Sequence, residues 1–298
     1  MIRAHLVMNP EARRVTPALL RVIAAALESR LKLEVTETHA RDAGIEIGRN
    51  AAGSGCELVI AFGGDGLVNE VVNGIAGTDA ALGIIPGGTM NVLARNLGIP
   101  RDPLKAADHL LQRVGHPEPH LLALGRANGR YFTFASGCGF DAEVAARVEA
   151  HREAKRRYGE AYFYAAALGT FTSTYLTRRP YLRCEGSFGT HEAVLAIALT
   201  AGPYAYLAGW PVRLAASPQA NGAMQVFMLR RLVPQRLPLY AAGVLSGRFG
   251  RHSSSYSGIG EMTVTGREPV PYHVDGESLP AAEHVHVRMS GDVLPVVI

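Results

Sequence analysis

The stretch LVIAFGGDGLVNEVVNG, residues 58–74, places three glycines and one aspartate between an apolar run and a run of helical character. Its first part, residues 58–62, is continuously apolar, which is typical of a strand covered on both faces. Residues 66–75 are predicted to form a helix. The glycines therefore lie where a buried strand ends and a helix begins.

The same alternation extends to both sides of this stretch. Thr16 and Pro17 are suited to the cap and first turn of a helix that spans residues 16–31. Strands separated by helices predict a doubly wound (Rossmann-like) parallel α/β domain. The expected strands are residues 5–9, 33–38, 57–62 and 81–86, and the other expected helices are residues 41–52, 66–75, 89–98 and one that begins at Asp102.

The pattern changes after about Pro119, where short β-rich runs alternate with turns of Gly, Pro and Asn. These runs predict an antiparallel β-sandwich with a helical insertion at residues 141–177. The predicted domains are an α/β domain at residues 1–119 and a β-sandwich domain at residues 120–287.

The composition is typical of a folded chain, and its net charge bears on the kind of ligand that it could bind. The 298 residues are 48% hydrophobic and 19% charged, which is typical of globular proteins. A net charge of +4 is compatible with phosphate-bearing ligands or an anionic membrane surface. Three scattered cysteines, Cys56, Cys138 and Cys184, favour a reducing compartment. No signal peptide is expected, and no apolar run reaches the roughly 20 residues that span a bilayer.

The GGDG turn has two interpretations. Gly63, Gly64 and Gly66 let the backbone approach a ligand, and N–H groups at a helix N-terminus favour phosphate. Asp65 then has a purpose if it holds Mg²⁺ or faces the group to be phosphorylated. The alternative is a tight turn with a capping aspartate.

Two further motifs favour the ligand interpretation. A second glycine turn, Gly87-Gly88-Thr89, follows the next strand, so that two adjacent turns would hold one triphosphate. Near the C-terminus, Asp275 and Glu277 flank a glycine in YHVDGESLP, where the alternative is an ordinary Asp-Gly hairpin. The GxxxxGK[ST] and GxGxxG phosphate-binding patterns are absent from the sequence.

Together these motifs resemble the diacylglycerol kinase catalytic family, which includes bacterial diacylglycerol and other lipid kinases, sphingosine kinases and ceramide kinases. The resemblance extends over nearly the whole chain. It rests on NP at residues 9–10, GGDGLVNEVVNG at 63–74, GGTMNVLARNLGIP at 87–100, SGCGFDAEV at 136–144 and VDGE at 274–277.

The resemblance implies ATP and Mg²⁺ as cofactors, with Glu277 as general base and Asp65 near the reacting phosphate. It also implies that the tail, residues 288–298, returns to the first domain. The positions that match ATP-binding residues of the family are Asn9, Thr38, Gly63, Gly64, Gly66, Leu67, Asn69, Glu70, Gly88, Thr89, Asn91 and Asp275.

Three segments depart from the family pattern. Leu67 and Val92 replace the frequent Thr and Asp, as they do in some members. Asn221 and Gln225 stand where bacterial members carry carboxylates for a structural Mg²⁺. Because hard cations prefer charged oxygen ligands, this second metal site is doubtful.

The expected function is that of a lipid kinase, a phosphotransferase that moves the γ-phosphoryl group of ATP to the hydroxyl of a lipid such as a diacylglycerol or a sphingoid base. The alternatives are a lipid- or nucleotide-binding regulator with lost or weak activity, and a relative of NAD kinases, which share GGDG. The expected location is cytoplasmic, peripherally at a membrane surface. No nucleic-acid partner is expected, and a homodimer and the identity of the acceptor lipid stay open.

Overall fold

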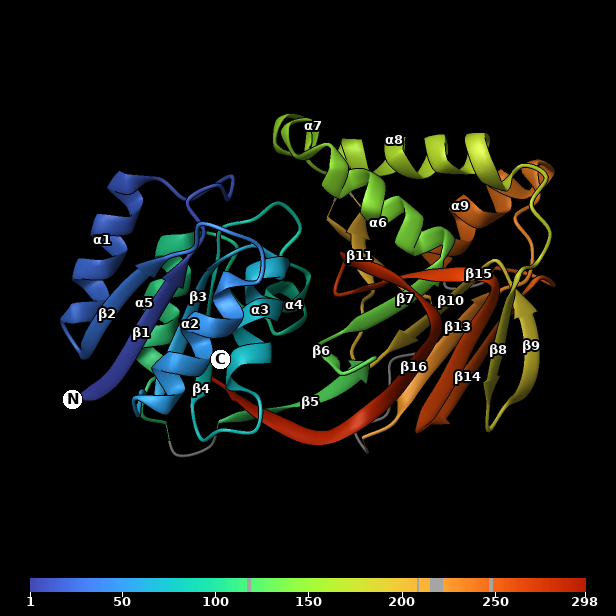
Figure 1. Ribbon diagram of the computed structural model, residues 1–298. Coiled ribbons are helices and arrows are strands. Elements are labelled where there is room, and N and C mark those ends of the chain that lie inside the picture. Colours follow the sequence, from blue (N-terminus) through green and yellow to red (C-terminus); the bar gives the residue numbers. More distant parts are fainter. Residues whose placement is uncertain (117–118, 208, 215–221, 247–248) are drawn as a thin grey trace. The chain divides into compact units, whose positions relative to one another are not determined.

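The computed structural model describes residues 1–116, 119–207, 209–214, 222–246 and 249–298 (Figure 1). The chain divides into two compact units. Unit 1 contains residues Met1–Ala123 together with Asp292–Ile298, and unit 2 contains residues Leu124–Gly291.

Unit 1 is built on a parallel sheet with the strand order β2-β1-β3-β4. The interior strands β3 and β4 are almost entirely buried, as their apolar runs predict. The C-terminal tail extends the sheet, because Val296 of β16 pairs in parallel with Leu82 of β4. The strands are β1 (Ile2–Met8), β2 (Leu31–Glu37), β3 (Leu58–Gly63), β4 (Ala81–Pro86) and the end of β16 (Glu277–Val296).

Helices cover both faces of this sheet, which confirms the predicted α/β class. Helix α1 packs against α5, and α2 packs against α3, so the two pairs lie on opposite faces (Figure 1). The Thr16 hydroxyl caps α1 by accepting a hydrogen bond from the Leu19 N–H at 3.2 Å. The helices are α1 (Pro17–Glu28), α2 (Ala43–Gly53), α3 (Asp65–Ile75), α4 (Val92–Asn96) and α5 (Pro103–Arg113).

Several helix boundaries in unit 1 differ from the prediction, and α1 ends at Glu28 rather than at residue 31. The helix expected at residues 89–98 is the short α4, because Asn91 has a left-handed conformation (φ 47°) that an α-helix excludes. The helix expected from Arg41 begins at Ala43, because Asp42 is also left-handed (φ 63°).

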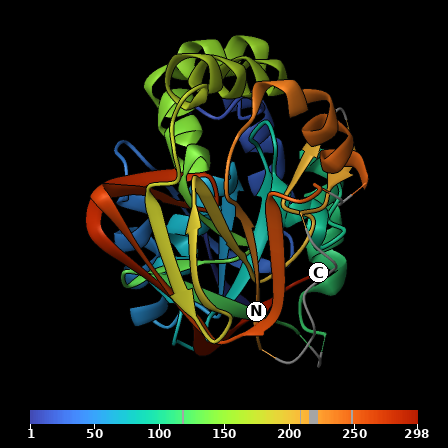
Figure 2. The same ribbon diagram turned by 90° about the vertical axis from the view of Figure 1, so that its right-hand side faces the viewer.

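Unit 2 is an antiparallel β structure, as predicted. Its strands follow the order β14-β13-β10-β7-β15-β16. Strand β15 pairs with β7 through Tyr272–Val274 and with β8 through Met262–Gly266, and its register shifts between these two parts. Figure 2 shows these strands from the side of unit 2. The strands are β5 (His120–Ala127), β6 (Arg130–Phe132), β7 (Ala135–Gly139), β8 (Leu182–Gly186), β9 (Gly189–Ala193), β10 (Leu195–Leu199), β13 (Met224–Leu229), β14 (Ser253–Ile259) and β15 (Glu261–Val274).

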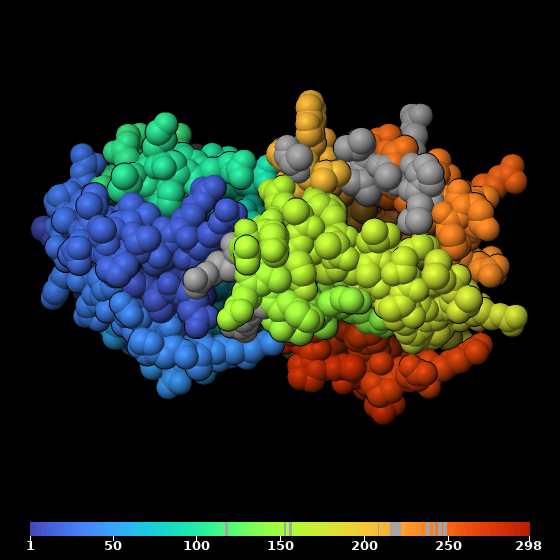
Figure 3. Space-filling model, turned by 90° about the horizontal axis from the view of Figure 1, so that it is seen from above, coloured from blue at the N-terminus to red at the C-terminus, as the bar shows by residue number. Residues whose placement is uncertain are grey.

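The predicted helical insertion is present and is divided into several pieces. Its residues form a broad part of the surface of unit 2 (Figure 3). The pieces are α6 (Phe140–Ala150), α7 (Arg152–Tyr158), α8 (Glu160–Thr170) and a short π-helix (Phe171–Tyr175).

Several elements of unit 2 were not predicted. They include helix α9 (Leu237–Ser246), strand β14 and the hairpin of β11 (Ala205–Leu207) and β12 (Trp210–Val212). The α9 sequence LPLYAAGVLS is apolar throughout, so it has no periodicity to indicate a helix. The hairpin strands are three residues each and are too short to show alternation.

Candidate active site

The N-terminal residues that the motifs indicate gather at the carboxyl edge of the parallel sheet in unit 1. Asn9 follows β1, and its side-chain oxygen accepts a hydrogen bond from the Glu11 N–H at 2.9 Å. Thr38 follows β2 and is buried, and its backbone N–H donates to the Met8 carbonyl at 2.8 Å. The glycine turns follow β3 and β4. This edge is where open α/β sheets bind ligands.

The two glycine turns meet through their backbones. The N–H of Gly87 donates to the carbonyl of Gly63 at 2.7 Å. A Cβ atom on Gly88 would lie only 2.5 Å from the Cα of Gly64, a distance that real Cβ atoms essentially never show. No side chain fits between the turns, so glycine is required at the contact.

Asp65 connects helix α3 with helix α4, which follows the second glycine turn. It lies in the first turn of α3, and its Oδ1 accepts a hydrogen bond from the Leu93 N–H of α4 at 3.2 Å. The side chain is partly exposed, in contrast to the buried Leu67. The carboxylate therefore lies beside two helix N-termini, whose dipoles favour negative charge.

Asn91 is occupied within its own turn. Its Nδ2 donates to the Gly88 carbonyl at 2.9 Å, and its Oδ1 accepts from the Gly88 N–H at 3.0 Å. The Gly88 N–H also lies 3.2 Å from the Gly63 carbonyl. This turn therefore uses the Gly88 N–H internally, so Thr89, which is partly exposed, is the better placed of the two for a phosphate.

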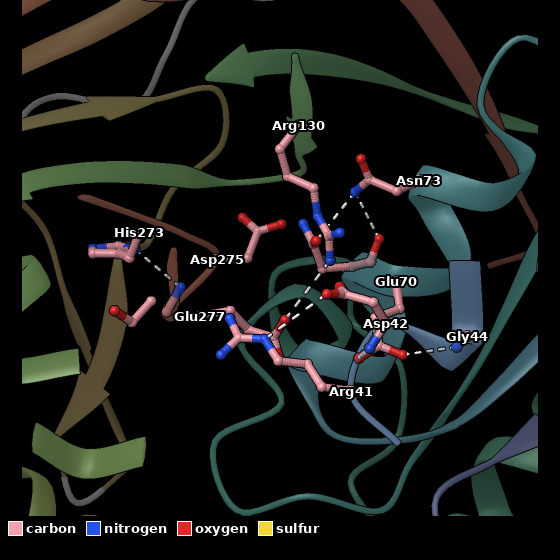
Figure 4. A network of polar contacts seen from close by, with 12 residues as sticks. Arg41, Asp42, Gly44, Glu70, Asn73, Arg130, His273, Asp275 and Glu277 are labelled. Atoms are coloured by element: carbon pink, nitrogen blue, oxygen red, sulfur yellow. Dashed lines mark hydrogen bonds and ion pairs between the residues drawn. The ribbon is translucent and has the colours of Figure 1, made fainter. Parts of the chain in front are cut away.

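Glu70 and Asn69 are buried on α3 and support neighbouring backbone. The two carboxylate oxygens of Glu70 accept from the N–H groups of Asp42 and Gly44, at 3.0 and 2.9 Å, where α2 begins (Figure 4). The side-chain oxygen of Asn69 accepts from Asn73 at 3.1 Å. Glu70 thus caps α2 from another helix, a function that its place in the motif does not reveal.

The VDGE motif of unit 2 forms a two-residue hairpin turn between β15 and β16. Val274 pairs with Glu277, and Asp275 and Gly276 both have positive φ, 49° and 82°. This is the geometry that Asp-Gly favours. The structural interpretation of the motif is therefore correct, and the turn also sets the place of Glu277 at the start of β16.

The Asp275 carboxylate is buried and accepts four hydrogen bonds. Its Oδ2 accepts from the N–H and hydroxyl of Thr133 at 2.8 and 2.9 Å, and its Oδ1 accepts from the N–H groups of Phe134 and Ala135 at 3.0 and 3.2 Å. These bonds join the turn to the segment between β6 and β7. Asp275 therefore organises unit 2, and its acceptor sites are occupied by protein donors.

Glu277 is more accessible than Asp275. Its side chain is 21% exposed, and its Oε2 lies 3.9 Å from the Arg130 guanidinium. The next residue, Ser278, donates its N–H to the Glu149 carboxylate of α6 at 3.0 Å. Glu277 is thus a partly exposed carboxylate on a well-anchored strand end.

Next to this turn, His273, Asp141 and Tyr204 form a set of hydrogen bonds that the sequence analysis did not predict. His273 contacts the Asp141 carboxylate at 2.5 Å, and the Tyr204 hydroxyl donates to the same carboxylate at 2.6 Å. Burial, and then the charge of Asp141, raise the pKa of Tyr204 well above its usual value. His273 and Asp141 lie inside the motifs YHVDGE and SGCGFD. The sequence signal that could have indicated them is a polar residue next to an apolar strand position.

The positions that replace the family's structural-metal carboxylates are only partly described. Asn221 lies outside the described residues. Gln225 is buried on β13, and its Nε2 donates to the Ser257 hydroxyl of β14 at 3.2 Å. Among the described residues, no group of three or more His, Cys, Asp or Glu side chains is arranged to hold a metal ion.

Comparison with known proteins identifies the N-terminal part of the chain. Residues 3–118 match the family model of the diacylglycerol kinase catalytic domain, which confirms the resemblance over these residues. A diacylglycerol kinase of Bacillus subtilis (strain 168) is 38% identical over 144 residues, 47% of this chain and 46% of that protein. A probable lipid kinase of Chromohalobacter salexigens is 32% identical over 143 residues, 47% of this chain and 44% of that protein. Each match thus spans about half of the curated relative.

Solved structures extend the similarity in fold to the whole chain. A putative diacylglycerol kinase from Bacillus anthracis str. Sterne superposes with a TM-score of 0.75 and 22% identity, covering 99% of this chain and 96% of that one. An NAD kinase from Archaeoglobus fulgidus in complex with ATP gives a TM-score of 0.54 and 11% identity, covering 100% of this chain and 94% of that one. At these identities the likeness shows the fold alone.

Proposed function

With a diacylglycerol kinase catalytic domain at residues 3–118 as the premise, we propose that the chain is an ATP-dependent lipid kinase. It would transfer the γ-phosphoryl group of ATP to the hydroxyl of a lipid. The observation that carries the proposal is the pair of glycine turns, because Gly63–Gly87 and Gly64–Gly88 approach without side chains between them. Such an edge leaves the phosphates of a nucleotide in contact with backbone.

On the ATP side, the first turn of α3 is the main phosphate-binding element. The first N–H groups of a helix have no acceptor within the helix, and Gly64 at the cap position adds no side chain. Thr89, Asn9 and Thr38 complete the binding edge. Asn69, Glu70, Asn91 and Asp275 act as supports for backbone, since their polar atoms bond to protein groups.

Mg²⁺ is implied by this chemistry and fits the residues present. Mg²⁺ in kinases is held by one or two carboxylates together with substrate phosphates, and Asp65 supplies a partly exposed carboxylate at the phosphate-binding edge. The ion would neutralise charge on the phosphates when bound. The protein's own contribution is to place Asp65 beside two helix N-termini.

On the acceptor side, Glu277 is the proposed general base. The lipid hydroxyl oxygen would form a bond to the γ-phosphorus as the bond from that phosphorus to the β-phosphate bridging oxygen breaks, releasing ADP. The hydroxyl proton would pass to the Glu277 carboxylate. A positioned base contributes about 10²- to 10⁴-fold in rate.

Helix α8 supports a lipid acceptor and docking at a membrane surface. It is apolar, yet Tyr164 and Leu168 are 37% and 57% exposed. Three arginines of unit 2, Arg157, Arg179 and Arg251, are exposed and would favour anionic lipid. No helix in the described part of the chain is long and apolar enough to cross a membrane.

Two further arginines of unit 2, Arg178 and Arg183, would contribute less to this attraction. Arg178 lies 3.1 Å from the Glu143 carboxylate, and Arg183 lies 2.6 Å from that of Glu185. Because these ion pairs neutralise charge within the protein, the attraction to anionic lipid would come from fewer cations than unit 2 contains.

The test is a screen of lipid alcohols with purified protein, labelled ATP and Mg²⁺. The panel would include diacylglycerol, monoacylglycerol, a sphingoid base, phosphatidylglycerol and an isoprenoid alcohol, with product masses measured. We expect phosphorylated product from at least one lipid and no ATP consumption without lipid. Binding without turnover of any lipid would favour a regulator, and phosphorylation of NAD would favour the NAD kinase alternative.

A further inference from the structure

The buried side chains of Asp141 and His273 and the half-buried Tyr204 form a chain of hydrogen bonds next to the Asp275-Gly276 turn. The Tyr204 hydroxyl donates to Oδ1 of Asp141 at 2.6 Å, and Oδ2 of Asp141 lies 2.5 Å from Nε2 of His273. His273 is 1% exposed and Asp141 8%. The proposed lipid kinase reaction does not use this group directly.

The other ring nitrogen of His273 contacts the turn. The N–H of Gly276 lies 3.2 Å from Nδ1 of His273 (Figure 4). Because a backbone N–H can only donate, Nδ1 must be the acceptor, and the proton of the neutral ring is on Nε2. That proton points at the Asp141 carboxylate, which stabilises this tautomer.

The surrounding backbone leaves room for the pair and for little else. A Cβ atom on Gly137 of β7 would lie 2.4 Å from both Oδ2 of Asp141 and Nε2 of His273. The absence of a Cβ atom at Gly137 therefore allows the side chains of His273 and Asp141 to come into contact next to β7. The imidazole ring has a defined place between α6 and the turn.

We propose that His273 and Asp141 are positioning residues for Glu277, a role that rests on the proposed kinase function. Asp141 fixes the His273 tautomer, His273 accepts the Gly276 N–H, and the Gly276 peptide sets the direction in which β16 begins at Glu277. Before this peptide, Asp275 is anchored through its carboxylate to the Phe134 N–H, and after Glu277, Ser278 donates its N–H to Glu149. A carboxylate acting as base requires such positioning, since a misplacement of about 1 Å costs about 10²-fold in rate.

Two substitutions of His273 test separately its hydrogen bond to Asp141 and its hydrogen bond to the Gly276 N–H. His273→Gln retains a donor that reaches Asp141 but has no acceptor at the Nδ1 position. His273→Asn retains an acceptor near the Nδ1 position but does not reach Asp141. We expect His273→Gln to lower kcat about 10- to 100-fold with KM for ATP changed less than twofold and little change in Tm, and His273→Asn to lower Tm while keeping more of kcat.

The matched control is His191→Gln, which removes a partly buried histidine that contacts the Tyr256 hydroxyl at 3.0 Å elsewhere in unit 2. Its kcat should equal that of the original chain. If kcat follows Tm across the three variants, or if His273→Gln has unchanged kcat, the positioning role is wrong.

A second measurement does not depend on turnover or on the folding of a variant. The ¹⁵N NMR spectrum of selectively labelled histidine should show His273 as the Nε2–H tautomer at neutral pH. A proton on Nδ1 would overturn the inference. If the original chain phosphorylates no lipid, the kinase proposal and the catalytic purpose of the pair both fail, whereas turnover with a proton on Nδ1 contradicts the positioning role alone.

Discussion

At the carboxyl edge of unit 1, two turns meet through backbone atoms of Gly63, Gly64, Gly87 and Gly88. In unit 2, by contrast, the Asp275-Gly276 turn is held by two side chains that accept hydrogen bonds, Asp275 from residues 133–135 and His273 from the Gly276 N–H. The first arrangement needs the absence of Cβ atoms, and the second needs particular polar atoms. The two regions should therefore fail in different ways. Added volume should damage the first, and lost hydrogen-bond acceptors should damage the second.

The largest effect on stability is expected for Asp275→Ala. This change removes the acceptor of three backbone N–H groups and one hydroxyl in a buried site. Since each buried unsatisfied group costs about 1–3 kcal/mol, we expect unit 2 to lose about 3–5 kcal/mol. Hydrogen exchange of residues 133–135, read by mass spectrometry, measures the loss locally.

The control for this change is Glu277→Ala, two residues away on a partly exposed side chain. It should alter the protection of residues 133–135 by less than about 0.5 kcal/mol. Equal losses in both variants would mean that the Asp275 bonds do not hold the turn.

A smaller loss of stability is expected for Gly88→Ala, which adds volume instead of removing hydrogen-bond acceptors. The new Cβ would lie 2.5 Å from the Gly64 Cα, and backbone on both sides cannot move aside easily. We expect a loss of about 1–3 kcal/mol in unit 1 and weaker ATP binding, because the two turns are forced apart. Calorimetric titration with ATP and a thermal melt measure both quantities.

Gly53→Ala is the matched control, since a Cβ atom at the end of α2 would meet nothing within 4 Å. It should leave ATP affinity unchanged and raise stability by about 0.4–1 kcal/mol. An ATP affinity in Gly88→Ala equal to that of Gly53→Ala would contradict a phosphate site at the glycine turns.

The smallest effect is expected for Glu70→Ala. Glu70 lies on the helix after the first glycine turn, but its bonds are side-chain bonds of the kind found in unit 2. Both oxygens accept N–H groups where α2 begins, so its removal should cost about 1–2 kcal/mol, as loss of a helix cap does. Faster hydrogen exchange should be confined to the first turn of α2, and a loss spread over all of unit 1 would contradict a local capping role.

Features of the fold that depend on local sequence patterns could be predicted from the sequence. The strand and helix order of unit 1, the Thr16 cap and the two adjacent glycine turns all follow from local patterns. The start of α3 could be predicted to within one residue, because glycines directly after a buried apolar strand indicate the turn at which the strand ends.

What could not be predicted depends on contacts between distant residues. The bond from Glu70 to α2 joins segments 28 residues apart, and the bonds from Asp275 to Thr133 join segments 142 residues apart. No local pattern distinguishes such a carboxylate from one that binds a ligand. The left-handed Asn91, which shortens α4, is also set by its bonds to Gly88.

The measurement that tests the central claim most directly is lipid-dependent phosphoryl transfer in the original chain, in Asp65→Asn, in Glu277→Gln and in the double variant. We predict a fall of about 10²- to 10⁴-fold in kcat for Glu277→Gln, a clear fall for Asp65→Asn, and a double variant that loses less than the product of the two, because both carboxylates serve one reaction. An unchanged kcat in Glu277→Gln, or a double variant whose loss equals the product of the two single losses, would contradict the account.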